Sequence, residues 1–290
     1  MAEGVLELSI RMAGKEIAEY LREENVKEIE NLKEKGIVPT LAAIRVGERP
    51  DAVSYENSTI KWLDKLNIGC ETFHYDENID KKTFLEEIEK INNMKNIHGM
   101  LLFRPIPKEL DTRELEYAIS PIKDIDGMNP LNFGKICVQD ESGHAPCTAE
   151  AVMEILKFHK IDLSGKKVVV LGRSMVIGKP VAMLLINANA TVTVCHSRTK
   201  DLPSVCKQAD ILVAAIGKAG FVTADYVKEG AIVIDVGINV LESGGITGDV
   251  DYDAVAGKCS YITPVPGGVG SVTNAVLARH IVKAAKNLSK

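Results

Sequence analysis

The chain has 290 residues, of which 46% are hydrophobic and 26% charged, and its length suggests two globular domains at roughly 150 residues each. Its 35 Lys and Arg against 40 Asp and Glu give a net charge of −5, and no stretch is dominated by basic residues. This excludes a general nucleic-acid binder. No apolar run reaches the roughly 18 residues of a membrane span, and the N-terminal sequence MAEGVLELSIRMAGKEIAEYL lacks a signal-peptide pattern. We therefore expect a cytoplasmic protein without nucleic-acid or membrane partners.

The six cysteines are scattered, with no C-x-x-C spacing and no histidine at zinc-ligand spacing. We expect reduced thiols and no metal site. These cysteines are Cys70, Cys137, Cys147, Cys195, Cys206 and Cys259.

Strand-like apolar runs alternate with amphipathic helical patterns along the whole chain. In the first half, strands are predicted at Thr40–Val46, Cys70–Tyr75 and Gly99–Phe103. The helices between them are predicted at three places: a long helix ending at Lys35-Gly36, one around Tyr55–Leu66, and one at Lys81–Met94.

The second half continues the alternation with five short, β-branched runs. Strands are predicted at Lys167–Leu171, Thr191–Cys195, Ile211–Ile216, Ala231–Val236 and Ser260–Thr263. Continuous apolar runs such as KKVVVLG suit strands that are buried on both faces, so the sheets should be largely parallel and the fold class α/β. Helices are predicted at Ala149–His159, with Thr148 as its N-cap, and at roughly Thr273–Asn287. We expect the domain boundary near Pro146-Cys147-Thr148.

The strongest local motif is VVVLGRSMVIGKP, from Val168 to Pro180. A buried strand runs into Gly172, Arg173 and Ser174, and Gly178 then opens a helix. Small residues let the backbone approach a phosphate, and the helix N-terminus supplies free N–H groups, so this arrangement indicates a dinucleotide site. The spacing G-x-S-x-x-x-G differs from the usual G-x-G-x-x-G, and a simple strand-to-helix turn is the alternative.

The next predicted strand indicates which dinucleotide binds. NAD sites usually carry an acid about 20 residues on, for the ribose 2′-hydroxyl. Here that strand ends in Cys195-His196-Ser197-Arg198 without an acid. Arg173, Ser197 and Arg198 could hold a 2′-phosphate instead, so the sequence favours NADP.

Taken with these residues, five segments resemble the methylenetetrahydrofolate dehydrogenase/methenyltetrahydrofolate cyclohydrolase family. The segments are VGERP-x4-Y, KDIDG, GRSMVIGKP, DVGIN and YITPVPGGVG, spread from residue 46 to 270. The resemblance implies a homodimer that binds tetrahydrofolate derivatives in a cleft between two domains. The first is an N-terminal α/β folate domain, residues 1–148 with a C-terminal helix at 272–290. The second is a Rossmann-like NADP domain, residues 149–271.

The resemblance also assigns individual residues. Tyr55 matches the tyrosine that lies over the folate, and Asp126 matches the aspartate that grips the pterin, although an Asp-Gly turn is the simpler interpretation of Asp126. The cofactor positions are Gly172, Arg173, Ser174, Ser197 and Ile238. The glycine-rich loop of the folate site is represented by Pro266, Gly267 and Gly270.

Two positions depart from the family pattern. The family has the pattern Y-x-x-x-K, but here Thr59 stands in place of the lysine. The family also has V-Q-L-P-L-P, and here Phe103 stands in place of the glutamine. The resemblance credits that lysine and glutamine with activating water in the cyclohydrolase step. A desolvated lysine can act as a base, whereas a threonine hydroxyl cannot at neutral pH. Lys61 lies roughly 120° round the helix from Tyr55, and Arg104 should face away from Phe103, so neither is expected to substitute.

The sequence therefore predicts an NADP-dependent 5,10-methylenetetrahydrofolate dehydrogenase of one-carbon metabolism with little or no cyclohydrolase activity, in which Tyr55 and Asp126 orient the folate. Two alternatives stay open. One is a bifunctional enzyme that makes 10-formyltetrahydrofolate, and the other is a non-catalytic NADP-binding regulator. A shikimate-dehydrogenase-like oxidoreductase shares the layout, but KDIDG and TPVPGGVG argue against it.

Overall fold

Two parallel β-sheets organise the chain, one in each of two units. The structure is a computed structural model that describes residues 9–289. Within it, residues 9–18 and 148–273 form the first unit, and residues 19–147 and 274–289 form the second. We expected all of residues 1–148 in one domain, but residues 9–18 group with 148–273 because β1 (Ile10–Arg11) pairs with β11 (Tyr261–Ile262). We expect no signal peptide at the N-terminus. Residues 1–8 of that segment lie outside the described residues.

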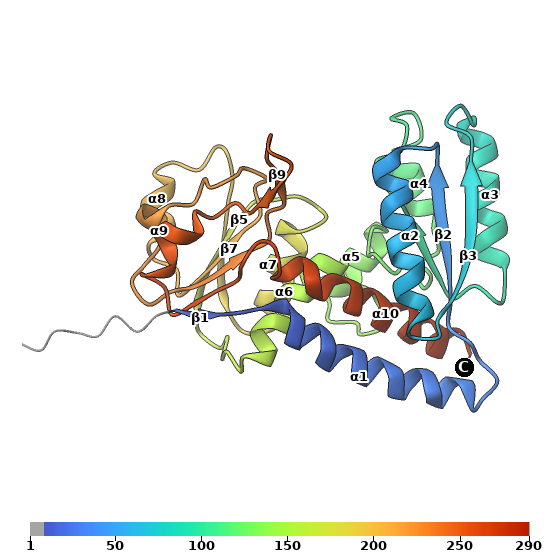
Figure 1. Ribbon diagram of the computed structural model, residues 1–290, viewed down its shortest axis with the longest axis horizontal. Coiled ribbons are helices and arrows are strands. Elements are labelled where there is room, and N and C mark those ends of the chain that lie inside the picture. The colour runs from blue at the N-terminus through green and yellow to red at the C-terminus, as the bar shows by residue number, and fades with distance from the viewer. Residues whose placement is uncertain (1–8, 290) are drawn as a thin grey trace, which may run out of the picture. The chain divides into compact units, whose positions relative to one another are not determined.

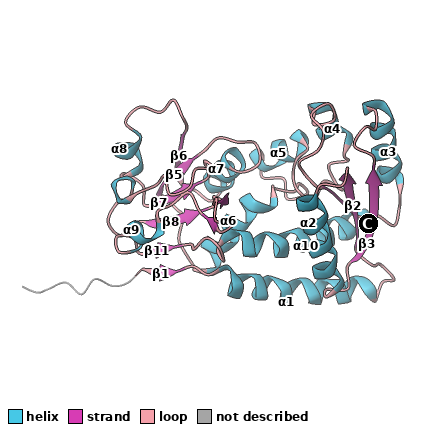
Figure 2. Ribbon diagram, turned by 45° about the horizontal axis from the view of Figure 1, so that its top comes forward, coloured by secondary structure: helices cyan, strands magenta, loops and turns pink. Residues whose placement is uncertain are grey.

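The first unit is built on a six-stranded sheet in which every pairing is parallel, as predicted (Figure 2). In spatial order its strands are β1, β11, β8 (Ile232–Asp235), β7 (Ile211–Ala214), β5 (Lys167–Leu171) and β6 (Thr191–Cys195). The predicted strands at 167–171 and 191–195 have these bounds, whereas those at 211–216, 231–236 and 260–263 are shorter in the structure.

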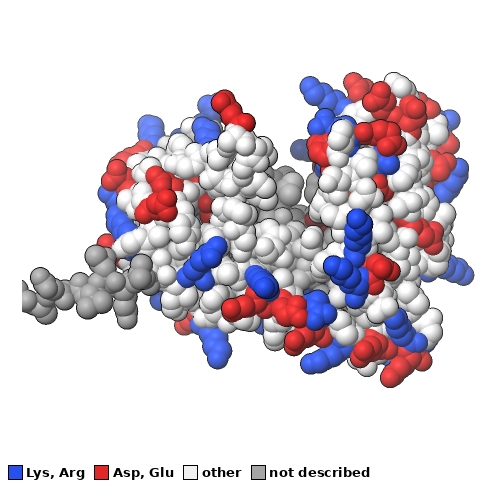
Figure 3. All heavy atoms as spheres, viewed as in Figure 1, with Lys and Arg blue, Asp and Glu red and all other residues white. Residues whose placement is uncertain are grey.

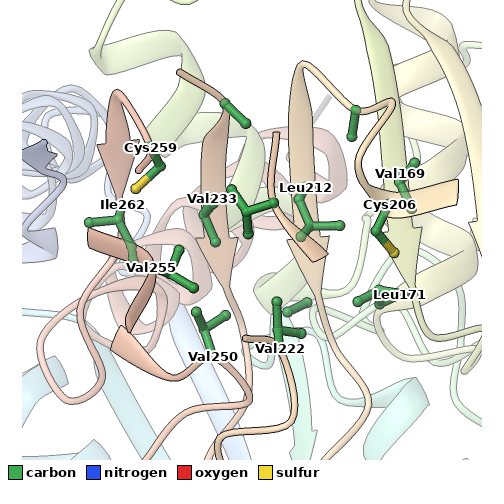
Figure 4. Packing of buried hydrophobic residues seen from close by; sticks show 14 of the residues in the cluster. Val169, Leu171, Cys206, Leu212, Val222, Val233, Val250, Val255, Cys259 and Ile262 are labelled. Atoms are coloured by element: carbon green, nitrogen blue, oxygen red, sulfur yellow. The ribbon is translucent and has the colours of Figure 1, made fainter. Parts of the chain in front are cut away.

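The interior strands of this sheet are buried along most of their length, because helices cover an open parallel sheet on both faces. Val169, Leu171, Leu212 and Val233 belong to one apolar cluster, which Figure 4 shows from close by. The remaining elements of the unit are α6 (Cys147–Phe158), α7 (Gly178–Asn187), α8 (Leu202–Cys206), η1 (Ala224–Tyr226), the antiparallel pair β9 (Asn239–Val240) and β10 (Ile246–Thr247), and α9 (Tyr252–Ala256). The expectation that Thr148 caps α6 is wrong, since α6 begins at Cys147 and Thr148 lies in its first turn.

The second unit contains a three-stranded parallel sheet in the order β3 (Gly69–Tyr75), β2 (Thr40–Val46), β4 (Gly99–Leu102). Alternate residues of β2 point to opposite faces. Ala42, Ile44 and Val46 pack in one cluster with α3 (Lys81–Asn93) and α4 (Arg113–Ala118). Arg45 therefore points to the other face, where it contacts α2 (Pro50–Asp64). A further helix, α5, spans Pro130–Cys137.

Two long helices, α1 (Gly14–Lys33) and α10 (Val269–Leu288), contribute residues 19–33 and 274–288 to this unit, where they run side by side (Figure 1). The buried Asn25 amide donates to the Ala275 carbonyl at 2.9 Å, and Arg279 pairs with Glu24 at 2.9 Å. Acidic and basic side chains alternate over the exposed face of α1 (Figure 3), as expected of a solvated amphipathic helix. Among residues 9–289, no helix combines the length and hydropathy that a membrane crossing requires.

Candidate active site

Tyr55 and Phe103 are in direct contact in the second unit. Their ring centroids lie 5.4 Å apart with an interplanar angle of 88°, an edge-to-face arrangement. Tyr55 is on α2 with 44% of its surface exposed, whereas Phe103, directly after β4, is 2% exposed. The apolar ring of Phe103 therefore supports the tyrosine from its buried side.

Thr59 lies one turn after Tyr55 on α2 and is 2% exposed. Its hydroxyl oxygen is buried and has no hydrogen-bond partner among the described residues. Lys61 is exposed, as predicted, and Arg104 is exposed and pairs with Asp111. At positions 59 and 103 the described residues therefore offer a hydroxyl and a phenyl ring, neither of which is a base.

The segment KDIDG uses its charged residues for three different purposes. The buried Lys123 ammonium donates to the Asn92 and Met94 carbonyls, each at 2.7 Å, and so holds the C-terminal end of α3. The buried Asp124 carboxylate accepts from the Asn129 backbone N–H at 2.7 Å. Lys123 and Asp124 fix the loop, and this leaves Asp126 as the member that can serve a ligand.

Asp126 is half-buried, and its Oδ1 accepts from the Cys147 backbone N–H at 3.4 Å. Burial, with a further contribution from the charge of Asp124, raises the pKa of Asp126 to about 6. Burial also raises the pKa of Tyr55 to about 12, and the nearby Asp126 and Cys147 add to this effect. At neutral pH the pair therefore consists of a carboxylate acceptor and a protonated phenol.

The turn between β5 and α7 leaves no room for side chains on its glycines. Gly172 has φ +120°, and a Cβ there would lie 2.1 Å from the Ala215 carbonyl oxygen. A Cβ on Gly178 would lie 2.2 Å from the Gly172 carbonyl oxygen. The Ser174 hydroxyl accepts from the Ile177 and Gly178 amides, at 3.1 and 3.3 Å, and so shapes the N-terminal turn of α7. This cradle suits a phosphate at a helix N-terminus, and the residues present fit a dinucleotide.

Arg173, Ser197 and Arg198 come from the ends of two neighbouring strands. Leu171 of β5 is paired with Cys195 of β6, and the Gly172 amide continues this ladder to the Cys195 carbonyl at 2.9 Å. All three side chains are exposed. The first unit therefore presents two guanidinium groups and a hydroxyl at the carboxyl edge of β5 and β6, where a phosphate could be bound.

Ile238 lines the same cavity as the glycine-rich loop, a cavity of about 200 Å³ in the first unit. Its walls include Pro266, Gly267 and Gly270, together with Ile246 of β10. The cavity lies at the carboxyl ends of β8 and β11, the edge at which α/β sheets bind ligands. Ile238, which the resemblance assigns to the cofactor, thus lines the same cavity as the three loop residues that the resemblance assigns to the folate.

Several supporting residues were missed by the sequence reasoning. Asp235 accepts from the Gly237, Asp249 and Val250 amides at 2.9–3.0 Å, and burial raises its pKa to about 6. The His280 imidazole, on α10, lies 2.7 Å from the Ile125 carbonyl, next to Asp126. No spacing rule connects residues 155 positions apart, so nothing in the sequence could have identified this contact.

The described residues contain no group of three or more His, Cys, Asp or Glu side chains arranged to hold a metal ion. All six cysteines are free thiols.

Two family models match the chain. One is described as "Tetrahydrofolate dehydrogenase/cyclohydrolase, catalytic domain" and matches residues 12–126. The other is described as "Tetrahydrofolate dehydrogenase/cyclohydrolase, NAD(P)-binding domain" and matches residues 146–289.

Relatives and solved structures agree with these matches over almost the whole chain. The chain is 50% identical to the "Bifunctional protein FolD" of Alkaliphilus oremlandii, over 95% of this chain and 96% of that protein. It is similar to the crystal structure of the bifunctional methylenetetrahydrofolate dehydrogenase/cyclohydrolase from Campylobacter jejuni, with 43% identity, a TM-score of 0.94, and coverage of 96% and 99%. The Trypanosoma brucei enzyme, complexed with NADP cofactor and inhibitor, gives 33% identity, a TM-score of 0.90, and coverage of 98% and 99%.

Proposed function

The chain belongs to the tetrahydrofolate dehydrogenase/cyclohydrolase family, and from this we propose that it oxidises 5,10-methylenetetrahydrofolate with NADP and has little or no cyclohydrolase activity. The observation that carries the second part is the contact between Tyr55 and Phe103 beside the buried hydroxyl of Thr59. The family resemblance implies a lysine at position 59 and a glutamine at position 103.

Hydride transfer requires little acid–base chemistry from the protein. A hydride leaves the one-carbon bridge of the folate, and the folate becomes the 5,10-methenyl cation. When bound, NADP supplies the ring that accepts the hydride. The protein must hold the folate in the reacting geometry and exclude water, which is catalysis by positioning.

The side chains suit this task. The Tyr55 ring is half-exposed and braced by Phe103, so it can lie flat against a pterin. The carboxylate of Asp126 can accept from the adjacent amino and N–H groups of the pterin. Pro266, Gly267 and Gly270 would line the folate site, where the glycines let a ligand approach the backbone closely.

The cofactor side is supported by the cradle of Gly172, Ser174 and Gly178. Arg173, Ser197 and Arg198 would hold the 2′-phosphate that distinguishes NADP from NAD, and Ile238 would also contact the cofactor.

Cyclohydrolase activity would need a base that removes a proton from water as it attacks the methenyl cation. Thr59 cannot supply one, and Phe103 offers no polar atom. Phe103 also makes its surroundings drier, which favours hydride transfer over hydrolysis of the product.

A second candidate is the bifunctional enzyme. It is favoured by the name of the 50% identical relative, "Bifunctional protein FolD". Spectra recorded during incubation of the protein with methylenetetrahydrofolate and NADP separate the two. Accumulating methenyltetrahydrofolate supports the lone dehydrogenase. NADPH formation with only 10-formyltetrahydrofolate accumulating supports the bifunctional enzyme, and tight NADP binding without turnover supports a regulator.

We also propose that the chain acts in the cytoplasm as a homodimer, by analogy with the family. Analytical ultracentrifugation of the purified protein tests the oligomeric state directly, because the monomer mass is 31.5 kDa. A single species at that mass would contradict the dimer.

A further inference from the structure

We propose that Arg45 and Glu56, a buried ion pair that joins β2 to α2, are positioning residues for Tyr55. The pair fixes the rotation of α2 about its axis and its position along that axis, so that the Tyr55 ring meets the folate. This inference rests on the proposed function, since it requires that Tyr55 contacts the folate.

Arg45 connects three consecutive parts of the second unit. Its Nε donates to Glu56 Oε2 on α2 at 2.7 Å, and its Nη1 lies 2.9 Å from Glu48 Oε2. The same Nη1 donates to the Gly47 carbonyl. One guanidinium therefore fixes the end of β2, the loop that follows it and the helix that carries Tyr55.

Glu56 is held from a second direction. Its Oε1 lies 2.7 Å from His74 Nε2 on β3, and His74 is the strand partner of Arg45 in the sheet register. Both carboxylate oxygens are thus engaged, one by β2 and one by β3. The residues Arg45 and Glu56 are only 4% and 3% exposed. Although burial opposes it, hydrogen bonding to Glu56 and Glu48 raises the pKa of Arg45, so the guanidinium is charged at every physiological pH.

The pair acts on Tyr55 because Tyr55 and Glu56 are consecutive on one helix. Each residue advances roughly 100° around the axis, so a rotation of α2 that moves Glu56 moves the Tyr55 ring by the same angle. Tyr55 is 44% exposed, and its ring meets that of Phe103 edge to face in an apolar contact. The charged hydrogen bonds of the ion pair are more directional than this contact and therefore supply a stronger angular constraint on α2.

Stability alone would not require charges here. A buried ion pair often contributes no more to stability than well-packed apolar side chains of similar volume, whereas removal of one partner is strongly destabilising. The informative variant therefore replaces both partners, Arg45→Met with Glu56→Leu. A matched control is Glu19→Leu with Arg22→Met, which removes an exposed ion pair from α1 in the same unit.

The test measures KM for methylenetetrahydrofolate, KM for NADP, kcat and Tm in the full-length protein. We expect the Arg45→Met/Glu56→Leu variant to keep its Tm within a few degrees and its KM for NADP. Its KM for the folate should rise roughly five- to tenfold, within the coupling range of residues that share contacts. The control should change neither KM.

The decisive comparison repeats the double substitution in a Tyr55→Ala background. If the pair acts through Tyr55, the substitutions raise the folate KM no further once the ring is absent. An unchanged folate KM in the first background, or an equal increase in both backgrounds, would overturn the proposal and leave the pair a purely structural role.

Should the double variant fail to fold, Arg45→Lys tests the same point, because it keeps the charge but loses the planar fork that reaches Glu56, Glu48 and Gly47 together. We expect Arg45→Lys to raise the folate KM roughly two- to threefold when Tyr55 is present, and not to raise it in the Tyr55→Ala background. A folate KM equal to that of the unmodified protein would refute the proposal. Failure of the proposed function looks different, since the unmodified protein would then form no NADPH from methylenetetrahydrofolate.

Discussion

The rings of Tyr55 and Phe103 meet edge to face, at a centroid distance of 5.4 Å and an angle of 88°. Both the phenyl ring and the nearby Thr59 are 2% exposed, so this side of Tyr55 is apolar apart from one buried hydroxyl. On this side of Tyr55, neither Thr59 nor Phe103 supplies a base that could activate water.

The first prediction introduces the lysine and glutamine that the family resemblance implies at positions 59 and 103. Thr59→Lys combined with Phe103→Gln should raise methenyltetrahydrofolate hydrolysis, by up to the roughly 10²–10⁴-fold that a placed base and its partner contribute. The control Thr59→Met with Phe103→Gln supplies similar length without an amine and should stay at the parental rate. Equal rates in the two variants would show that a lysine at this position does not reach the reacting water.

The second prediction concerns the choice of cofactor. Arg173→Ala with Arg198→Ala removes two guanidinium groups that match phosphate geometry, so KM for NADP should rise on the order of tenfold while KM for NAD changes little. Lys200→Ala, which removes an exposed cation two residues after Arg198, is the matched control. Equal or better catalytic efficiency with NAD in the unmodified protein would contradict the assignment.

The third prediction concerns Asp126. Its replacement by alanine leaves the donor pair of the pterin without an acceptor, which should cost on the order of 1–3 kcal/mol of folate binding. NADP binding should be unaffected, as should both affinities in the control Glu141→Ala, an exposed acid of the same unit. Normal folate binding by Asp126→Ala would mean that this aspartate serves only the Asp-Gly turn.

The fourth prediction is a pair of opposite pH dependences. Since the pKa of Asp126 is raised to about 6, its carboxylate is neutralised as the pH falls from 7 to 5, and KM for the folate should increase over that range. The stability of the free protein should also increase as the pH falls, so folate affinity and stability change in opposite directions. A carboxyl whose folded-state pKa exceeds its ordinary value of 3.8 contributes stability as the pH falls through 6.

Asp126→Asn does not titrate, so the part of both dependences that comes from this residue should disappear in that variant. Profiles of folate KM and Tm against pH, recorded for both proteins, make the comparison. Identical profiles would show that another group titrates near pH 6 in this site.

Much of the fold follows from short-range sequence signals. The β-branched runs at 40–46, 167–171 and 191–195 are strands with these bounds, because such runs are too short for helices and too apolar for loops. By contrast, β1 is two residues long and pairs with β11, some 250 positions away, and no local pattern indicates that contact. The short β9 and β10 pair was missed for the same reason, since two-residue strands have no period to detect.

The candidate site shows the same limit. Helical geometry correctly turns Lys61 away from Tyr55 to the exposed surface of α2. It could not show that Phe103 contacts Tyr55, because this depends on how α2 and β4 pack together. The ion pair between Arg45 and Glu56 joins a strand to a helix across a loop, and neither the 3.6-residue nor the 2-residue period relates those two positions.

In the proposed function, the protein oxidises methylenetetrahydrofolate and has little or no activity in hydrolysing the product. The sharpest measurement is the decay of methenyltetrahydrofolate absorbance with and without the protein, over a range of substrate concentrations and corrected for the spontaneous rate. We predict a decay little faster than in buffer, from the same preparation that reduces NADP with methylenetetrahydrofolate. A saturable acceleration with ordinary enzymic turnover would contradict the proposed function and require a base other than the residue at position 59.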